Sequence, residues 1–160
     1  MNIIYRDSEE KDLEQFDEIL SSSGFFYESE IEEARGFLKY NLEDGPEDSG
    51  INYIMAEADG KLVGFVCFGF DYCTESSYLL YWIAVHGDFR GKKIGSELLK
   101  RFEEWVKAKG GKKIVLETAG RELYNPTRIF YERHGYTEQG VVPDYYSKGD
   151  ARVTFVKDIA

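Results

Sequence analysis

Apolar residues near the start of the chain recur at helical spacing. The first six residues are a short apolar run, which predicts a strand. Leu13 and Phe16 begin a series that falls on one face of a helix, and Ser8, which precedes acidic residues, is its expected N-cap. The same spacing predicts a second helix over Glu28–Leu42. SSSGFFYES, between the helices, and GPEDSG, after the second, are expected to be loops, and the first is expected to expose its three aromatic residues.

The spacing then changes to that of strands. Residues 51–70 form two apolar runs joined by Asp59-Gly60, a dipeptide typical of a two-residue hairpin turn. The run Leu79–Val85 is apolar on both faces, which predicts a strand in the middle of a sheet. Helical spacing returns at Ile94 and ends at the pair Gly110-Gly111.

The last third of the chain predicts a strand, a helix and a strand pair. KKIVLET is the strand, and NPTRIFYERHG is a helix with Asn125 as its expected cap and Pro126 as its first residue. The tail is expected to be two strands around a long loop. This order of elements predicts an α/β fold with an antiparallel meander in the middle of a mixed sheet, and a single domain over residues 1–160.

Composition argues against several classes of protein. Of 160 residues 42% are hydrophobic, enough for a packed core. The net charge of −10 argues against a protein that binds nucleic acid or an anionic membrane over its whole surface. The N-terminus is acidic where a signal peptide is apolar, and Cys67 and Cys73 are interpreted as core thiols of a reducing compartment, so we expect a cytoplasmic location. His86 and His134 lack neighbouring ligands, so no metal site is expected.

Charge is distributed unevenly along the chain. Residues 1–60 hold 17 Asp and Glu against 4 Lys and Arg, whereas residues 90–133 hold 12 Lys and Arg against 6 Asp and Glu. Solvated helix faces are one explanation. The other is that the second part of the chain binds a polyanionic ligand and the first part attracts a cationic one.

The segment HGDFRGKKIGSELL, which begins at His86, has the features of a phosphate site. Arg90, Lys92 and Lys93 precede a predicted helix, where the helix dipole disfavours each cation by about 0.3 to 1 kcal/mol. Two glycines allow a ligand to approach the backbone, and the first-turn amides of a helix bind anions. A glycine-containing turn with solvated lysines is the alternative. The segment matches neither the P-loop nor the G-x-G-x-x-G motif.

Two motifs resemble those of the GNAT superfamily of N-acyltransferases. Arg90–Gly95 (RGKKIG) is similar to the acyl-CoA motif, in which Arg or Gln and two further residues precede Gly, one residue, and Gly or Ala. Lys93 stands where the family usually has its first glycine. Asn125–Tyr136 (NPTRIFYERHGY) is similar to a second motif, a helix with Phe-Tyr, three residues and Gly-Tyr. The resemblance covers residues 53–157 and implies a mixed, mostly antiparallel sheet of about seven strands, splayed in the middle, with helices on both faces.

The resemblance also implies acetyl-CoA as the cofactor. Tyr131 matches the family's tyrosine beside the thioester sulfur, where a phenol with a pKa near 10 can protonate a thiolate whose conjugate acid has a pKa of about 8.5. The central strand is expected to hold the pantetheine arm through its backbone, and the amides after it to hold the pyrophosphate. The expected cofactor-binding residues are Ile83, Ala84, Val85, Arg90, Gly91, Lys92, Lys93, Ile94, Gly95, Ser96, Asn125 and Arg128.

The general base and the amine that accepts the acetyl group are predicted from less specific sequence patterns. Glu117, at the end of the next strand, is the candidate base, and Tyr81, His86 and Asp144 are considered after it. The acceptor, a small-molecule or peptide amine, is expected to be cationic because the first 60 residues are acidic. Alternatively, the acidity serves solubility and the aromatic residues close a small core. The expected substrate-binding residues are Phe25, Phe26, Tyr27, Tyr81, Asp144 and Tyr145.

The function predicted from these patterns is direct transfer of an acetyl group from acetyl-CoA to a primary amine. The alternative is a non-catalytic acyl-CoA-binding or interaction module on the same fold. Turnover distinguishes the two. A monomer and a homodimer are both compatible with the sequence.

Overall fold

The strands of the chain form one seven-stranded sheet. The structure is a computed structural model that describes residues 2–160. The strand order is β1-β2-β3-β4-β5-β7-β6, and the pairing of β4 with β5 is parallel, whereas β1–β2, β2–β3, β5–β7 and β6–β7 are antiparallel. The predicted α/β class and mostly antiparallel sheet are therefore confirmed. The strands are β1 (Ile3–Arg6), β2 (Asn52–Ala58), β3 (Lys61–Phe70), β4 (Ser77–Val85), β5 (Lys113–Ala119), β6 (Thr137–Ser147) and β7 (Asp150–Asp158).

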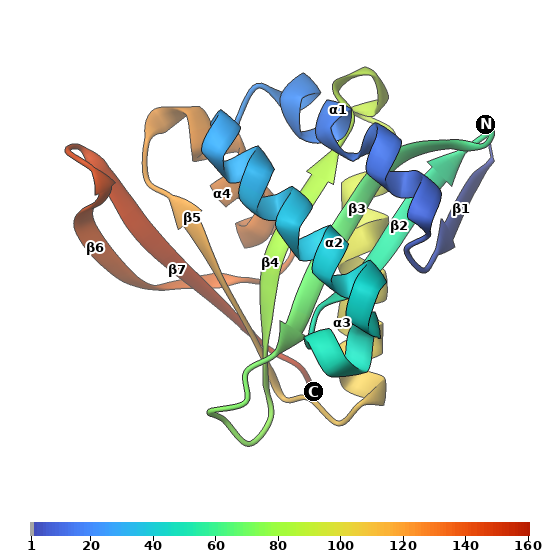
Figure 1. Ribbon diagram of the computed structural model, residues 1–160. Coiled ribbons are helices and arrows are strands. Elements are labelled where there is room, and N and C mark those ends of the chain that lie inside the picture. The colour runs from blue at the N-terminus through green and yellow to red at the C-terminus, as the bar shows by residue number, and fades with distance from the viewer. Residues whose placement is uncertain (1) are drawn as a thin grey trace. The chain divides into compact units, whose positions relative to one another are not determined.

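Helices connect these strands (Figure 1). The α-helices are α1 (Leu13–Ser23), α2 (Glu28–Ser49), α3 (Ile94–Ala108) and α4 (Asn125–Arg133). The short 3₁₀-helices are η1 (Glu10–Asp12), η2 (Gly87–Phe89) and η3 (Glu122–Tyr124). Within residues 2–160, no helix combines the length and the apolar character that crossing a membrane requires.

The chain divides into two compact units. The first comprises the chain up to Phe70 together with Leu80–Trp105, and the second comprises Asp71–Leu79 together with Val106–Ala160. The ladder between β4 and β5 has three residue pairs, from Ser77 opposite Lys113 to Leu79 opposite Val115, and all three lie in the second unit. The rest of β4 belongs to the first unit, where it follows β3 in the sheet.

The first unit has a packed layer on each face of its strands. Phe16 of α1 packs against Tyr53 and Phe65, with ring centroids 6.2 and 4.5 Å apart. On the other face, Phe102 of α3 packs against Phe68, with ring centroids 4.5 Å apart. In Figure 1, α1 and α2 lie in front of β2 and β3, and α3 lies behind them. All five side chains are buried, and each contributes about 1.5 to 3 kcal/mol by leaving water.

The hairpin of β2 and β3 confirms the predicted turn. Asp59 and Gly60 have φ of 50° and 81°, and a positive φ at both positions defines a type I′ turn. Farther along β3 the register shifts, because Val63 is an extra residue that forms a β-bulge. The carbonyl of Val63 accepts a hydrogen bond from the amide of His86 at 2.8 Å. The bulge thereby holds the residue that follows β4.

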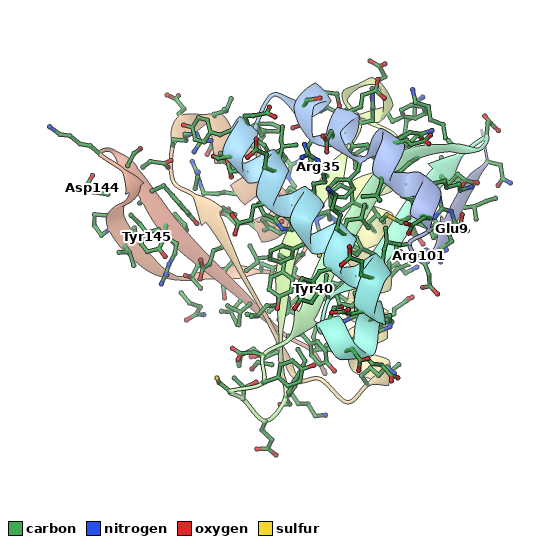
Figure 2. All side chains as sticks on the ribbon, in the orientation of Figure 1. Glu9, Arg35, Tyr40, Arg101, Asp144 and Tyr145 are labelled. Carbon is green, nitrogen blue, oxygen red and sulfur yellow. The ribbon has the colours of Figure 1, made fainter. Side chains whose placement is uncertain are left out.

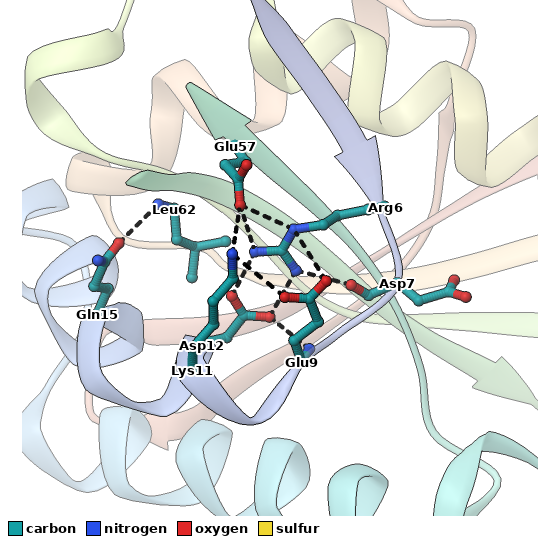
Figure 3. Close-up of polar contacts among 8 residues, drawn as sticks. All are labelled: Arg6, Asp7, Glu9, Lys11, Asp12, Gln15, Glu57 and Leu62. Atoms are coloured by element: carbon teal, nitrogen blue, oxygen red, sulfur yellow. Dashed lines mark hydrogen bonds and ion pairs between the residues drawn. The ribbon is translucent and has the colours of Figure 1, made fainter. Parts of the chain in front are cut away.

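Ser8 is not the N-cap of α1, contrary to the prediction. Its hydroxyl donates a hydrogen bond to Oδ1 of Asn41 on α2. The amide of Glu9 instead donates to Oδ2 of Asp12 at 2.8 Å, and η1 precedes α1. Asp12 is buried and accepts two further hydrogen bonds from the Arg6 guanidinium, at 2.7 and 3.0 Å (Figure 3). A carboxylate paired with an arginine therefore begins this helix, because charged partners form stronger hydrogen bonds than a hydroxyl does.

The segment GPEDSG is helical, so the prediction of a loop is wrong. α2 kinks at Gly45, which has φ 80° and ψ 165°, and continues to Ser49. Pro46 follows the kink at the start of a new turn, where its missing N–H needs no acceptor. Gly50, with φ 72°, then ends the helix in the left-handed conformation.

The second unit packs α4 against β7. The rings of Tyr131 and Phe155 have centroids 6.2 Å apart. Asn125 is the first residue of α4 rather than its cap, because η3 ends at Tyr124 and leads directly into the helix. Pro126 is accordingly the second helical residue rather than the first.

The two C-terminal strands form a hairpin without the predicted long loop. β6 extends to Ser147, and only Lys148 and Gly149, which has φ 82°, connect it to β7. The register shifts between Val142 and Ser147, so the four residues between them form a bulge within the strand. Valine and tyrosine favour a strand over a loop, which explains the difference.

Candidate active site

His86 fixes the start of the segment between β4 and α3. Its side chain is buried, and Nδ1 accepts a hydrogen bond from the amide of Asp88 at 3.1 Å. In the neutral ring the proton is therefore on Nε2, which lies 3.5 Å from Oε2 of Glu18 on α1. These contacts give His86, one of the bases considered from the sequence, a structural role between β4 and α1.

The backbone of residues 90–96, named here the phosphate loop, leads into α3 through two residues in the left-handed conformation. Gly91 and Lys93 have φ of 76° and 61°, and these conformations turn the chain into α3. The carbonyl of Lys93 accepts a hydrogen bond from the amide of Glu97 at 3.1 Å, so the first turn of the helix begins here. First-turn amides have no acceptor within their helix and carry a partial positive charge. Among the described residues, a Cβ at Gly91 would meet no atom within 4 Å apart from those of its chain neighbours, so there is open space beside the backbone here. Binding of a diphosphate by these amides stays a prediction.

At the position where the GNAT pattern has a glycine, Lys93 adopts the backbone conformation of a glycine. The left-handed conformation at this position costs a residue other than glycine about 1 to 2 kcal/mol. The lysine side chain is exposed. The backbone thus keeps the conformation that a glycine favours.

Arg90 directs its side chain away from the helix N-terminus, to the loop between α1 and α2. Nη2 donates a hydrogen bond to the carbonyl of Ser23 at 2.6 Å. The guanidinium carbon lies 5.1 Å from the ring centroid of Phe25. The sequence motif placed Arg90 in the phosphate loop but did not indicate this second contact.

Aromatic side chains gather beside this loop in the first unit. Phe26 packs edge-on against Trp82 of β4, with ring centroids 6.0 Å apart. Phe37 of α2 lies 5.3 Å from Tyr81 and 6.3 Å from Trp82. Phe37 thus contacts the side chains of two adjacent residues of β4. Nε1 of Trp82 is buried and has no hydrogen-bond acceptor among residues 2–160, a feature that sequence analysis did not indicate.

The prediction that three consecutive loop aromatics are exposed is wrong for two of them. Phe25 and Phe26 are partly buried, because one lies beneath Arg90 and the other packs on Trp82. Tyr27 is 58% exposed, as predicted.

In the second unit, Tyr131 lies in a buried aromatic cluster. It is 3% exposed, and its ring centroid lies 5.4 Å from that of Phe130 and 5.6 Å from that of Tyr136. Burial raises the pKa of the Tyr131 phenol above its usual value, and the nearby Tyr124 adds to this shift. The phenol is therefore neutral at physiological pH and retains a proton to donate.

Glu117 belongs to a polar cluster on the second unit. Its Oε2 lies 3.7 Å from Nε of Arg152, and the Arg152 guanidinium lies 4.7 Å from the ring centroid of Tyr145. Burial, with a smaller contribution from Glu117, raises the pKa of Tyr146 to about 12. Four residues thus form this group, named here the hairpin cluster: Glu117, Tyr145, Tyr146 and Arg152.

Asp144 has a structural contact in the same hairpin. It has φ 55°, and its Oδ1 accepts a hydrogen bond from the amide of Gly149 at 2.7 Å. Figure 2 shows Asp144 and Tyr145 on the hairpin of β6 and β7. The structure therefore brings Tyr145 together with Glu117, through Arg152, whereas Asp144 holds the turn.

The comparison with known proteins identifies the fold. The model of the acetyltransferase (GNAT) family matches residues 9–136. The chain belongs to this family. A GNAT-family acetyltransferase from Desulfovibrio desulfuricans has a TM-score of 0.95 and 30% sequence identity, covering 99% of this chain and 100% of that one.

Two further acetyltransferases resemble this chain over different shares of its length. An N-acetyltransferase from Methanocaldococcus jannaschii is 30% identical over 106 residues, which are 66% of this chain and 65% of the relative. An aminoglycoside 6′-N-acetyltransferase in complex with coenzyme A has the same fold, with a TM-score of 0.75 and 22% identity, covering 100% of this chain and 98% of that one.

The GNAT family consists of acyltransferases that use acetyl-CoA, so the predicted family, enzyme class and cofactor are confirmed. The family match begins at residue 9 and so includes both N-terminal helices, which the sequence motifs did not reach.

Two of the predicted cofactor-binding residues, Asn125 and Arg128, lie on α4. Nη1 of Arg128 donates hydrogen bonds to the carbonyls of Ala119 and Arg121, at 2.7 and 3.1 Å, and so ties α4 to the end of β5. Asn125 is exposed. Contacts of either residue with the cofactor stay predictions, as do those of the backbone of Ile83, Ala84 and Val85 in β4.

Proposed function

We propose that this protein transfers the acetyl group of acetyl-CoA directly to a primary amine, and that the preferred amine is cationic. The catalytic part of this proposal rests on the burial of Tyr131, which matches the tyrosine of the GNAT motif. Its surroundings keep the phenol neutral. A protein that only binds acyl-CoA needs no hydroxyl at the thioester sulfur, whereas packing alone needs only the ring.

The phosphate loop supports the binding step. Its backbone turns at Gly91 and Lys93 and leads into the first turn of α3, where a partial positive charge favours the diphosphate. Lys92 and Lys93 add exposed cationic side chains to the same loop. Their Coulomb attraction weakens as salt increases, whereas the backbone contacts persist.

Bound acetyl-CoA supplies a thioester, whose carbonyl carbon gains a bond to the amine nitrogen and loses its bond to sulfur, which leaves as a thiolate. Tyr131 stabilises this thiolate by donating a hydrogen bond. Its raised pKa disfavours complete proton transfer to a thiolate whose conjugate acid has a pKa of about 8.5. We therefore assign Tyr131 as a hydrogen-bond donor to sulfur, a narrower role than that of a full general acid.

Glu117 is our candidate for the group that accepts the proton from the attacking amine. It is exposed, and Arg152 is its cationic neighbour. An amine with a pKa near 10.4 is almost entirely protonated at neutral pH, so a base has to remove one proton, directly or through water.

The acidic residues of the first unit support a cationic acceptor. Residues 1–60 contain 17 Asp and Glu against 4 Lys and Arg. α1 and α2 carry most of these carboxylates, and the exposed Tyr27 at the start of α2 adds a ring face that favours cations. A field of this sign attracts polyamines, aminoglycosides and basic peptides more than neutral amines.

Acceptor charge tests this proposal. Thiol release from acetyl-CoA is measured with amines of similar size that are cationic, neutral or anionic apart from the reacting group. We expect the highest kcat/KM for a cationic amine, with an advantage that shrinks as salt increases. A neutral or anionic amine that exceeds every cationic one in kcat/KM would contradict the electrostatic part of the proposal while leaving acetyl transfer intact.

A further inference from the structure

Arg90 joins two segments that lie far apart in the sequence. Its guanidinium donates to the carbonyl of Ser23 at 2.6 Å and lies 5.1 Å from the ring centroid of Phe25. The amide of Gly87 donates to Oγ of Ser22 at 3.0 Å. A Cβ at Gly87 would lie 2.8 Å from the Ser22 carbonyl oxygen, so the two backbones approach closely. The segment after β4 is therefore held against the end of α1.

The Arg90 contact provides a charge that α1 itself lacks. Ser23 is the last residue of α1, and the last turn of this helix contains no basic residue. The carbonyl end of a helix carries a partial negative charge and favours a cation. Arg90 supplies that cation, and a hydrogen bond from a charged donor is stronger than one between neutral groups.

Arg90 is also the first residue of the phosphate loop. Its backbone is extended, with φ −65° and ψ 154°, and the left-handed residues Gly91 and Lys93 follow. A ligand held by the loop amides restricts this backbone, and with it the base of the Arg90 side chain. Arg90 therefore connects the backbone of the phosphate loop to Ser23 and Phe25.

The segment that receives this contact is the loop of residues 24–27, named here the α1–α2 loop. Phe26 in this loop packs against Trp82, with ring centroids 6.0 Å apart. A change in the α1–α2 loop therefore also changes the aromatic surroundings of β4.

We propose that Arg90 is a positioning residue that couples occupancy of the phosphate loop to the order of the α1–α2 loop, and through it to binding of the amine. The proposal rests on the proposed function, because it takes the amine as the second ligand. It differs from a direct role in which the guanidinium binds the pyrophosphate. Positioning affects the amine more than acetyl-CoA, whereas direct binding affects acetyl-CoA more.

Arg90→Gln and Lys92→Gln form a matched pair of variants. Both remove one positive charge from the exposed part of the same loop, but only the first removes the contact with Ser23. Arg90→Lys retains the charge without the planar guanidinium and is expected to restore part of the coupling. Arg90 is exposed, so each of these variants is expected to fold.

Hydrogen exchange of residues 24–27 is measured with and without saturating coenzyme A, and initial rates are measured with the best amine. In the wild type and in Lys92→Gln, coenzyme A should slow this exchange about 5-fold or more, the lower end of typical coupling between sites. In Arg90→Gln the slowing should disappear and KM for the amine should rise about 5-fold or more. KM for acetyl-CoA should stay within about 3-fold of that of Lys92→Gln, because the charge loss is the same.

Two results would overturn the positioning role. One is equal slowing of exchange by coenzyme A in Arg90→Gln and Lys92→Gln. The other is a rise in KM for acetyl-CoA in Arg90→Gln alone, with KM for the amine unchanged, which would identify the guanidinium as a phosphate ligand. If the wild type releases no thiol with any amine but coenzyme A still slows exchange through Arg90, the proposed function is wrong and the mechanical coupling is supported.

Discussion

Glu117 and Tyr131 lie on opposite faces of the ladder formed by β5 and β7. Tyr131 contacts Phe155, which pairs with Leu116, whereas Glu117 is the next residue along β5 and pairs with Thr154. Because strand side chains alternate, Leu116 and Phe155 face α4 and Glu117 faces away from it. The two reactive groups proposed for this protein are therefore separated by the sheet. Because the sulfur and the attacking nitrogen are bonded to one carbon during transfer, a Glu117 that acts while Tyr131 contacts the sulfur has to accept the amine proton through water.

Tyr131→Phe should lower kcat about 100-fold, because the phenol acts on the leaving sulfur only as the bond breaks. The affinity for coenzyme A should change by less than about 3-fold. Initial rates and calorimetric titration measure the two quantities. Tyr136→Phe removes the hydroxyl of a buried neighbour and is the control. Equal kcat values for the wild type and Tyr131→Phe would show that sulfur leaves without this residue.

The pH dependence of kcat/KM for the amine tests Glu117. If its carboxylate accepts the proton of the amine, Glu117→Gln should lower kcat/KM and change the pH profile, which in the variant should follow deprotonation of the amine alone. The profile is measured from about pH 5 to 9, with Glu122→Gln as an exposed acidic control. An unchanged profile in Glu117→Gln would direct the search to Tyr81, His86 or a chain of water molecules.

Gly91→Asp should raise KM for acetyl-CoA about 10-fold or more, equivalent to about 1.4 kcal/mol, because it adds a negative charge beside the phosphate-binding amides. Gly110→Asp is a close control. Gly110 has φ 82° against 76° for Gly91, and within residues 2–160 a Cβ at either position would meet nothing within 4 Å beyond its chain neighbours. Strain from aspartate is therefore similar in the two variants. A KM that rises equally in both would contradict the assignment of the phosphate loop.

Lys93→Gly should stabilise the protein. Glycine removes about 1 to 2 kcal/mol of left-handed strain and costs about 0.5 to 1 kcal/mol in backbone entropy, a net gain of at most about 1.5 kcal/mol. Urea unfolding measures this free energy. Lys92→Gly is the control, because Lys92 lies in the same loop without a positive φ and should lose stability. Destabilisation by Lys93→Gly would mean that the lysine side chain contributes more than the strain costs.

The sequence predicted those parts of the fold that depend on local patterns. Apolar spacing and Asp59-Gly60 predicted the central strands and their turn, whereas the phosphate-binding role of the glycine-rich cationic segment stays a prediction. Local patterns failed where distant partners decide the structure. Arg6, through Asp12, determines how α1 begins, and Ser8 bonds to Asn41 instead.

The same distinction applies to the candidate site. Tyr131 and the loop glycines are recognisable because their chemistry is local to a motif. The contact of Arg90 with Ser23 spans 67 positions in the sequence, and the hairpin cluster depends on the register of β5 with β7. Neither has a local sequence signal, so both appear only when the chain is folded.

Amine-dependent thiol release tests the central claim most directly. Wild-type protein is mixed with acetyl-CoA and a panel of polyamines, aminoglycosides, amino acids and basic peptides, and both free thiol and acetylated amine are quantified. We predict that thiol and acetylated amine appear in equal amounts and that no acetyl group becomes attached to the protein. Tyr131→Phe should slow the formation of both products to the same extent. Tight binding of acetyl-CoA with no thiol release in the presence of any amine would contradict the account and identify a protein that binds acyl-CoA without catalysis.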